Sequence, residues 1–196
     1  ENTIAYLSFG FLDGSVNPAP INGVEAEVAN VANDTYPIYR PLNMVTNGPP
    51  NELAQAFLDF IMSEEGQAIV AEDYIPVTSS EEEETMDLSG ELSLAGSTTV
   101  QPLAQALADA FMAKYPDVGI DVGGGGSSTG VTSAGEGTVD IGNASRNIKD
   151  SEFEEFPDLQ VHTIAFDGIA IVTHPDIELE SLTIAQVQSI FAGEIT

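Results

Sequence analysis

The sequence predicts an α/β fold with a largely parallel sheet flanked by helices. After residue 91, strand-like apolar runs alternate with segments whose apolar residues recur at helical spacing. Small, hydroxyl-rich blocks follow several of the strand-like runs, at the kind of junction where a helix begins. An apolar share of 42% is enough to form a core in a chain of 196 residues.

The first part of the chain, residues 1–77, is predicted to hold two strands and an interrupted helix. Residues 3–11 have the apolar character of a buried strand. Residues 36–46 also suit a strand, and their prolines favour a sheet edge or an irregular start. An apolar stripe over residues 53–61 predicts a helix, which residues 63–66 interrupt.

An acidic linker, residues 78–90, separates this part from the second part, residues 91–196. Its run of glutamates repels itself and favours a solvated, extended segment. The second part is predicted to contain strands over 92–95, 118–122 and 139–142, and helices over 100–114 and 128–137.

The end of the second part is predicted to hold a strand pair and a last helix. Residues 160–173 are interpreted as two strand segments that pivot at Asp167-Gly168. Thr183 and Gln186 have the spacing of a capping box, which predicts a final helix after Thr183.

The charge of the chain excludes several classes of function. It carries 32 Asp and Glu against 4 Lys and Arg, a formal net charge of −28. So few cations cannot neutralise a phosphate backbone, so we expect no nucleic-acid partner, and adsorption to an anionic membrane is disfavoured. A surface this acidic suits high salt, where self-repulsion is screened, so we expect a halophilic or salt-tolerant source.

Cysteine and metal chemistry are also disfavoured. The chain has no cysteine, which excludes disulfides and thiolate sites. Its two histidines, His162 and His174, lie in no arrangement that suggests a catalytic triad or a metal centre, so strand packing or surface exposure is favoured for both. We therefore expect no metal and no cofactor.

Three small-residue blocks predict a site for an oxyanion. They are Gly96-Ser97-Thr98-Thr99, Gly123 to Gly130 with Ser127 and Ser128, and Asp140 to Arg146. The first two stand between a strand and a helix, where backbone N–H groups and hydroxyls face the positive end of a helix dipole. The alternatives are a plain helix cap for the first block and a flexible loop for the second. Asp167 is interpreted either as a solvated bulge residue or, preferably, as an acceptor aimed into a cleft.

Taken together, these blocks resemble the substrate-binding protein of phosphate ABC importers. The family pattern also includes the Phe166-Asp167-Gly168 pivot and an ending like residues 191–196, so the resemblance covers residues 88–196. Residues 3–77 resemble the same family, but its C-terminal part, through pieces such as Tyr36 to Leu42. The family's C-terminal segment therefore precedes its N-terminal segment in this chain.

The resemblance implies a single lobe of a type II periplasmic-binding-protein-like fold, with a central, mostly parallel sheet. Both segments belong to lobe one over residues 1–196, and the second lobe, which supplies an Arg, a Ser and a Gly-Thr pair in the family, has no matching segment here. The implied function is phosphate binding as the extracytoplasmic component of an ABC importer, periplasmic or tethered to the cell surface. The implied partners are inorganic phosphate, a membrane permease, and the missing lobe or a neighbouring repeat.

The resemblance assigns the phosphate to Ser97, Thr98, Thr99, Ser127 and Ser128, with Arg146 and Asp167 completing the site. Arg146 stands where some family members carry an acidic acceptor for the proton of phosphate, so that role is expected to pass to Asp167. A sensor or adhesion module built on the same lobe is the alternative function. An enzyme is the third, because no nucleophile–base pair supports catalysis.

Overall fold

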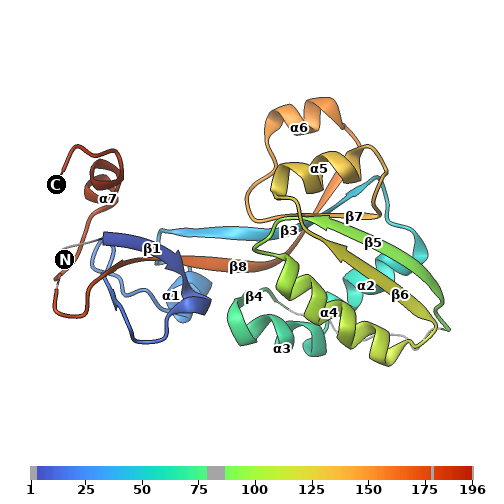
Figure 1. The fold of residues 1–196 in the computed structure, drawn as a ribbon, viewed down its shortest axis with the longest axis horizontal. Coiled ribbons are helices and arrows are strands. Elements are labelled where there is room, and N and C mark those ends of the chain that lie inside the picture. The colour runs from blue at the N-terminus through green and yellow to red at the C-terminus, as the bar shows by residue number, and fades with distance from the viewer. Residues whose placement is uncertain (1–3, 79–86, 178, 196) are drawn as a thin grey trace. The chain divides into compact units, whose positions relative to one another are not determined.

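The computed structural model describes residues 4–78, 87–177 and 179–195 (Figure 1). The chain forms two compact units, and each of them takes residues from both parts of the sequence. Unit 1 consists of Glu1–Arg40, Asp73–Ile75 and Phe166–Thr196, and unit 2 consists of Pro41–Glu72 and Pro76–Ala165.

Unit 2 is built on a mixed sheet with the strand order β8-β3-β7-β5-β6. Strand β5 runs parallel to both β6 and β7, while β3 runs antiparallel to β7, with Asn43 opposite Ala144. The α/β class is confirmed, and the antiparallel strand makes the sheet mixed. The strands are β3 (Tyr39–Asn47), β5 (Gly90–Gly96), β6 (Val118–Gly123), β7 (Ile141–Ala144) and β8 (Leu159–Thr173).

Helices cover both sides of this sheet. Figure 1 shows α5 and α6 on one side and α2 and α4 on the other. Aromatic packing joins α2 to α4, because the Phe111 ring lies 5.3 Å from that of Phe57 and 5.4 Å from that of Phe60. The helices are α2 (Glu52–Met62), α3 (Glu64–Asp73), α4 (Gln101–Lys114), α5 (Ser127–Gly135) and α6 (Asp150–Glu155).

The predicted helix break before residue 66 is confirmed and falls at Ser63. The Ser63 hydroxyl donates to the carbonyl of Phe60 at 2.6 Å and accepts from the N–H of Gly66 at 3.2 Å. One side chain thus serves the end of α2 and the start of α3.

Unit 1 is built around the second half of β8. Strand β1 (Ile4–Ser8) pairs with β8 in antiparallel register, from Ile4 opposite Thr173 to Ser8 opposite Ile169. The predicted capping box at Thr183 and Gln186 is present and begins α7 (Ile184–Phe191). The remaining elements are η1 (Phe9–Phe11), β2 (Asn17–Pro18), α1 (Val28–Ala32) and β4 (Ile75–Pro76). The unit has its own core, made of Ala19, Ile21, Val31, Tyr36, Ile75, Ile171 and Leu182.

Strands of residues 1–77 pair with strands of residues 91–173 in both units, as expected from a single fold shared by the two parts. Whether all of residues 1–196 form one lobe stays a prediction. Most of the acidic linker, residues 79–86, lies outside the described residues.

The expected pivot at Asp167-Gly168 is wrong as a division of the strand, because β8 is continuous through it. A Cβ on Gly168 would lie 2.6 Å from the Phe9 ring. The glycine therefore makes room for an aromatic ring without breaking the strand.

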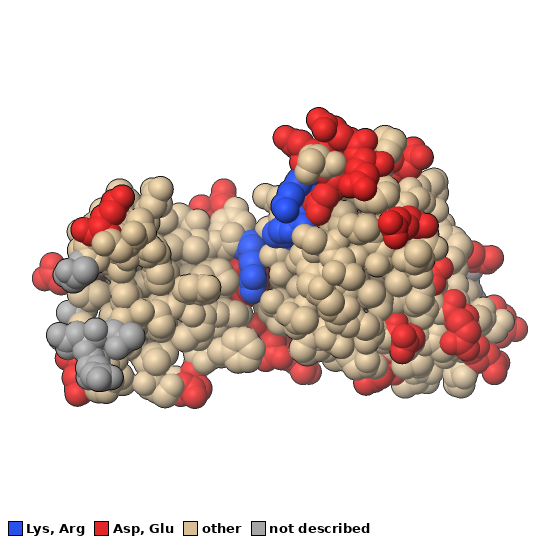
Figure 2. Space-filling model, turned by 45° about the horizontal axis from the view of Figure 1, so that its top comes forward, with Lys and Arg blue, Asp and Glu red and all other residues tan. Residues whose placement is uncertain are grey.

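Acidic side chains are spread over much of the surface drawn in Figure 2, as expected from the composition. Among the described residues, no helix combines the length and the apolar character that a membrane crossing requires.

Candidate functional site

Three glycines allow the predicted blocks to lie against one another in unit 2. A Cβ on Gly96 of β5 would lie 2.2 Å from the Asn143 carbonyl oxygen, and one on Gly130 of α5 would lie 2.5 Å from the same atom. A Cβ on Gly142 of β7 would lie 2.2 Å from the carbonyl oxygen of Gly130. These distances are shorter than any ordinary contact, so only glycine lets β5, α5 and β7 approach this closely.

The close approach gathers three serine hydroxyls, which we call the serine cluster: Ser97, Ser127 and Ser145. The Ser97 hydroxyl donates to the Ser145 hydroxyl at 2.9 Å, and the Ser127 and Ser145 hydroxyls lie 3.4 Å apart. The N–H of Ser145 also donates to the Ser127 hydroxyl at 3.1 Å. Each predicted block thus contributes one hydroxyl to a common point.

The starts of two helices lie at the serine cluster. Helix α5 begins at Ser127 itself, and α4 begins four residues after Ser97. The first N–H groups of a helix have no partner within the helix, and the dipole makes this end positive. The cluster therefore offers neutral donors backed by two partial positive charges.

The glycine-rich block is ordered, and two of its glycines are needed for backbone geometry. Gly125 and Gly126 have φ angles of 133° and 93°, which other residues rarely adopt. The N–H of Gly126 donates to the Gly96 carbonyl at 2.8 Å, so the first two blocks are joined directly. This geometry favours a turn of defined conformation over the flexible-loop alternative.

The Ser97 hydroxyl also accepts backbone N–H groups at the turn before α4, which agrees with the helix-cap alternative for its block. It accepts from the N–H groups of Thr99 at 3.2 Å and Val100 at 3.4 Å. Thr98 is exposed and Thr99 half-buried at the same turn. Both threonines lie beside the serine cluster. Among the described residues, the structure records no contact between the Thr98 hydroxyl and that cluster.

Arg146 lies at the rim of the cluster and is held by Glu152 of α6. Its Nη2 donates to the Ser128 hydroxyl at 3.1 Å, and its guanidinium meets both oxygens of Glu152, at 2.7 and 2.8 Å. Hydrogen bonding to Arg146 lowers the pKa of Glu152, and the same hydrogen bonds raise the pKa of Arg146. Both groups are therefore charged at neutral pH.

Asp167 lies in unit 1, where it is buried and already has partners. Its side chain is 1% exposed and receives the Ser8 hydroxyl on Oδ1. Its Oδ2 receives Nε of Arg40 at 2.9 Å and Nη2 at 2.8 Å. Asp167 is therefore not a solvated bulge residue, because it accepts from Ser8 and Arg40; its expected role toward phosphate stays a prediction.

Neither histidine joins the serine cluster. His162 is half-buried on β8, where its Nε2 lies 3.2 Å from the Thr46 hydroxyl, and burial lowers its pKa. His174 follows the last residue of β8 and is exposed, and its Nδ1 lies 3.5 Å from Asp176 Oδ2. Among the described residues, no group of His, Asp and Glu is arranged to hold a metal ion.

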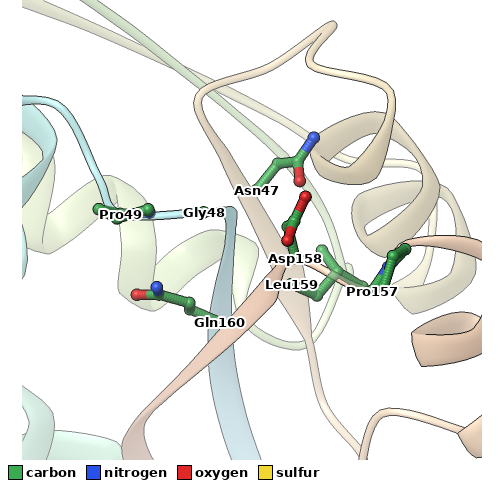
Figure 3. A pocket seen from close by; sticks show the side chains of 7 residues that line it. All are labelled: Asn47, Gly48, Pro49, Pro157, Asp158, Leu159 and Gln160. Atoms are coloured by element: carbon green, nitrogen blue, oxygen red, sulfur yellow. The ribbon is translucent and has the colours of Figure 1, made fainter.

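A hollow of about 600 Å³ lies elsewhere in unit 2, where β3 ends and β8 begins. It is lined by Asn47, Gly48, Pro49 and residues 157–160 (Figure 3). None of the residues predicted from the sequence to bind an anion lines it.

The structure adds four residues that the sequence patterns did not single out as site residues: Ser8, Arg40, Ser145 and Glu152. Ser145 lay within the third block, whose spacing pointed to the right place without indicating which side chain faces the others. Glu152 follows Arg146 by six residues on a short helix that the apolar pattern did not predict. Arg40 and Asp167 are 127 residues apart in the chain, and no local pattern signals such a pair.

The sequence matches two families of binding proteins. Residues 80–196 match the PBP superfamily domain, and residues 8–74 match the bacterial extracellular solute-binding protein family. These two ranges agree with the two parts that the sequence patterns separated.

Known relatives are similar along the whole chain or along part of it. The chain is 38% identical to the phosphate-binding protein PstS 2 of Streptococcus pneumoniae over 197 aligned residues, covering 100% of this chain and 67% of that protein. It is 36% identical to the phosphate-binding protein PstS of Bacillus subtilis over 107 residues, covering 55% of this chain and 36% of that protein.

A solved structure is similar over almost the whole chain. It is the crystal structure of a phosphate-binding protein of a phosphate ABC transporter from Streptococcus pneumoniae, with a TM-score of 0.89 and 37% sequence identity. The match covers 98% of this chain and 75% of that chain.

Proposed function

The chain belongs to the family of phosphate-binding proteins of ABC importers, and from this premise we propose that the serine cluster is its phosphate site. The observation that carries the proposal is the meeting of Ser97, Ser127 and Ser145 at the starts of α4 and α5. Hydroxyls and N–H groups at such a point can replace the water around an anion.

Neutral donors suit a protein of net charge −28, because they attract an anion locally against an unfavourable overall field. Each helix start contributes about 0.3–1 kcal/mol toward a negative charge near an exposed site. Thr98 and Thr99 add N–H groups and hydroxyls at the α4 turn, and Ser128 adds a hydroxyl in the first turn of α5. Arg146 lies at the rim, where it donates to the Ser128 hydroxyl.

Separately from the serine cluster of unit 2, we propose that Asp167 of unit 1 keeps the role of proton acceptor that the resemblance gives it. Support comes from its burial and from its carboxylate oxygens, which act as acceptors for Arg40 and Ser8. Fully ionised sulfate carries no proton to donate, so an acceptor in the completed site would favour phosphate over sulfate.

The second lobe is proposed to cover unit 1. Most of the large apolar side chains that are exposed among the described residues belong to this unit, including Tyr6 at 65%, Phe11 at 74% and Phe191 at 47%. The rings of Tyr6 and Phe191 pack together with their centroids 5.6 Å apart, which makes one apolar patch. Exposed apolar patches of this kind mark interaction surfaces, and the second lobe is the partner that we propose for this one.

The family is one of extracellular solute-binding proteins, not of enzymes. We therefore propose an extracytoplasmic location, in the periplasm or tethered at the cell surface. The partner in the membrane is the permease of the importer. Closure of the lobes over phosphate would signal to the permease that ligand is bound.

Titration calorimetry with inorganic phosphate tests the proposal. We expect weak binding by the 196-residue chain and much tighter binding once a second lobe, taken from the rest of the relatives' length, completes it. Equal affinity of the two forms would show that the site is not a two-lobe clamp. No binding by the completed form would remove phosphate as the ligand.

A serine variant locates the site within the completed form. Ser127→Ala removes a hydroxyl from the cluster, and we expect phosphate affinity to fall about tenfold, the effect of one hydrogen bond to a charged group. Ser151→Ala, an exposed serine on α6, is the matched control and should bind like the unchanged protein. Equal affinities for the two variants would place the site elsewhere.

A further inference from the structure

Most of the hydrogen bonds that the Arg146 guanidinium can donate go to groups of the protein itself. Its Nη1 donates to the Asn147 carbonyl at 2.9 Å and to Glu152 Oε2 at 2.8 Å. Its Nη2 donates to the Ser128 hydroxyl at 3.1 Å and to Glu152 Oε1 at 2.7 Å. Because each of these nitrogens carries two hydrogens, the fork that arginine normally offers to an oxyanion is already occupied.

Glu152 is itself held in place by other contacts, so the Arg146–Glu152 ion pair has a defined geometry. Its Oε2 also accepts the N–H of Lys149 at 2.9 Å, at the start of α6. The side-chain amide of Asn43 on β3 donates to the backbone carbonyl of Arg146 at 3.0 Å. The side chains of Arg146 and Glu152 are only 27% and 13% exposed. Neither partner can turn away without losing contacts that anchor it.

The pair also removes net charge from the rim of the serine cluster. Arg146 is the cation that the structure shows hydrogen-bonded to Ser128, in the first turn of α5. An unpaired guanidinium there would attract any anion at the cluster, and the carboxylate of Glu152 cancels most of that attraction.

Building on the proposed phosphate site, we infer that Glu152 is a positioning residue that limits anion affinity by holding Arg146 away from the anion. The bound anion then meets hydroxyls and N–H groups, while Arg146 acts on it only through Ser128. A site that holds its ligand without a free cation binds less tightly and releases more readily, which suits a protein that must deliver its ligand.

The test compares phosphate and sulfate binding by the lobe-completed protein and three variants. In Glu152→Gln the carboxylate charge is lost, while the amide oxygen can still accept from Lys149. We expect the affinity for both anions to rise about tenfold, the effect of one added charge-assisted hydrogen bond. We also expect a steeper loss of affinity between low and high NaCl, because a free cation is screened by salt.

Arg146→Gln and the double variant Arg146→Gln/Glu152→Gln show whether the effect passes through Arg146. The double variant should bind phosphate and sulfate with the same affinity as Arg146→Gln, so that the tenfold gain disappears when Arg146 is absent. Glu155→Gln, an exposed residue of the same helix, is the control for the change in net charge. It should leave both affinity and salt dependence close to those of the unchanged protein.

Three outcomes would overturn the inference. They are a fall in affinity in Glu152→Gln, a gain that persists in the double variant, and equal effects of Glu152→Gln and Glu155→Gln. A fall confined to Glu152→Gln, with a circular dichroism spectrum like that of the unchanged protein, would mean that Glu152 aims Arg146 at the anion. If the unchanged completed protein binds no phosphate, the proposed function fails and this inference fails with it.

Discussion

Asp167 shows how one charged residue can be buried inside an otherwise apolar strand. Its carboxylate is 1% exposed, and the Arg40 guanidinium and the Ser8 hydroxyl both donate to it. A buried charge is tolerated only when it is paired and hydrogen-bonded. Because β1, β3 and β8 each supply one of these three side chains, the hydrogen bonds of Asp167 also join the three strands.

We predict that Asp167→Asn destabilises the protein by about 1.5–3 kcal/mol, the range for hydrogen bonds to a charged group. The amide is neutral, and its NH₂ group would face the donors of Arg40. The measurement is urea denaturation, with Asp121→Asn, an exposed residue of β6, as the control. Equal urea midpoints for the two variants would mean that the hydrogen bonds to Asp167 add nothing to stability.

Asn143 presents the opposite case, a buried polar side chain without partners. It is 0% exposed on β7, and neither its amide nitrogen nor its amide oxygen has a hydrogen-bond partner among the described residues. Strand alternation places it on the same face as Ser145, two residues further along. Leaving both groups unsatisfied costs stability, so this residue is a local weakness beside the serine cluster.

Replacing Asn143 by Leu, which has a similar branched shape, should raise the free energy of unfolding by about 1–3 kcal/mol. Chemical denaturation of the variant and the unchanged protein measures the difference. A loss of stability would instead indicate that the amide binds an internal water molecule and satisfies its groups in that way.

At the scale of elements, the site depends on how closely β5, α5 and β7 pack. Gly96, Gly130 and Gly142 interlock at backbone contacts that leave no space for a Cβ. The serine hydroxyls meet because these three elements touch along their backbones. The small residues therefore act on the site by bringing the elements together, without contributing a hydrogen-bonding side chain.

Gly130→Ala is expected to cost about 1–3 kcal/mol of stability, as overpacking in a rigid core does. Its Cβ would lie 2.5 Å from the Asn143 carbonyl and 2.8 Å from that of Ala95, and neither backbone atom can rotate away. Phosphate affinity of the completed protein should fall together with stability. Thermal denaturation and calorimetry measure the two effects.

Gly123→Ala is the matched control for this prediction. A Cβ at Gly123 would meet its nearest atom at 3.5 Å, which is ordinary contact. If Gly130→Ala is as stable as Gly123→Ala, the close packing of the three elements is not needed.

At the scale of the whole molecule, charge dominates. A net charge of −28 makes the folded chain repel itself, and dissolved salt reduces that repulsion. The Debye length falls from about 10 Å at 0.1 M salt to about 3 Å at 1 M. The expectation of a halophilic or salt-tolerant source rests on this argument and stays a prediction.

We predict that the Tm rises between 0.1 M and 1 M NaCl, by about 2–4 °C for each kcal/mol of repulsion removed. Scanning calorimetry in chloride measures it, because sulfate would add a possible ligand. An uncharged osmolyte at matched osmotic strength is the control. A Tm that is constant or falls with NaCl would contradict the role given to self-repulsion.

The amino-acid sequence by itself determined the fold class and most of the longer helices and strands, and it predicted an oxyanion site. Apolar spacing placed α2 and α4, a capping box placed α7, and residues 63–66 indicated the break between α2 and α3, because all of these signals are local to the chain. Glycine and serine between strand and helix indicated an oxyanion site, because turn geometry and helix starts are also local. The same residues carried the resemblance to phosphate-binding proteins.

Only the tertiary structure decided which side chains meet. The pairing of Arg146 with Glu152, of Ser97 with Ser145 and of Arg40 with Asp167 depends on how β-strands and helices dock, across separations of up to 127 residues. The continuity of β8 was equally invisible, because the charge of Asp167 is balanced by residues far away in the chain. Local patterns encode backbone conformation, whereas partners are chosen when distant segments bury their surfaces against one another.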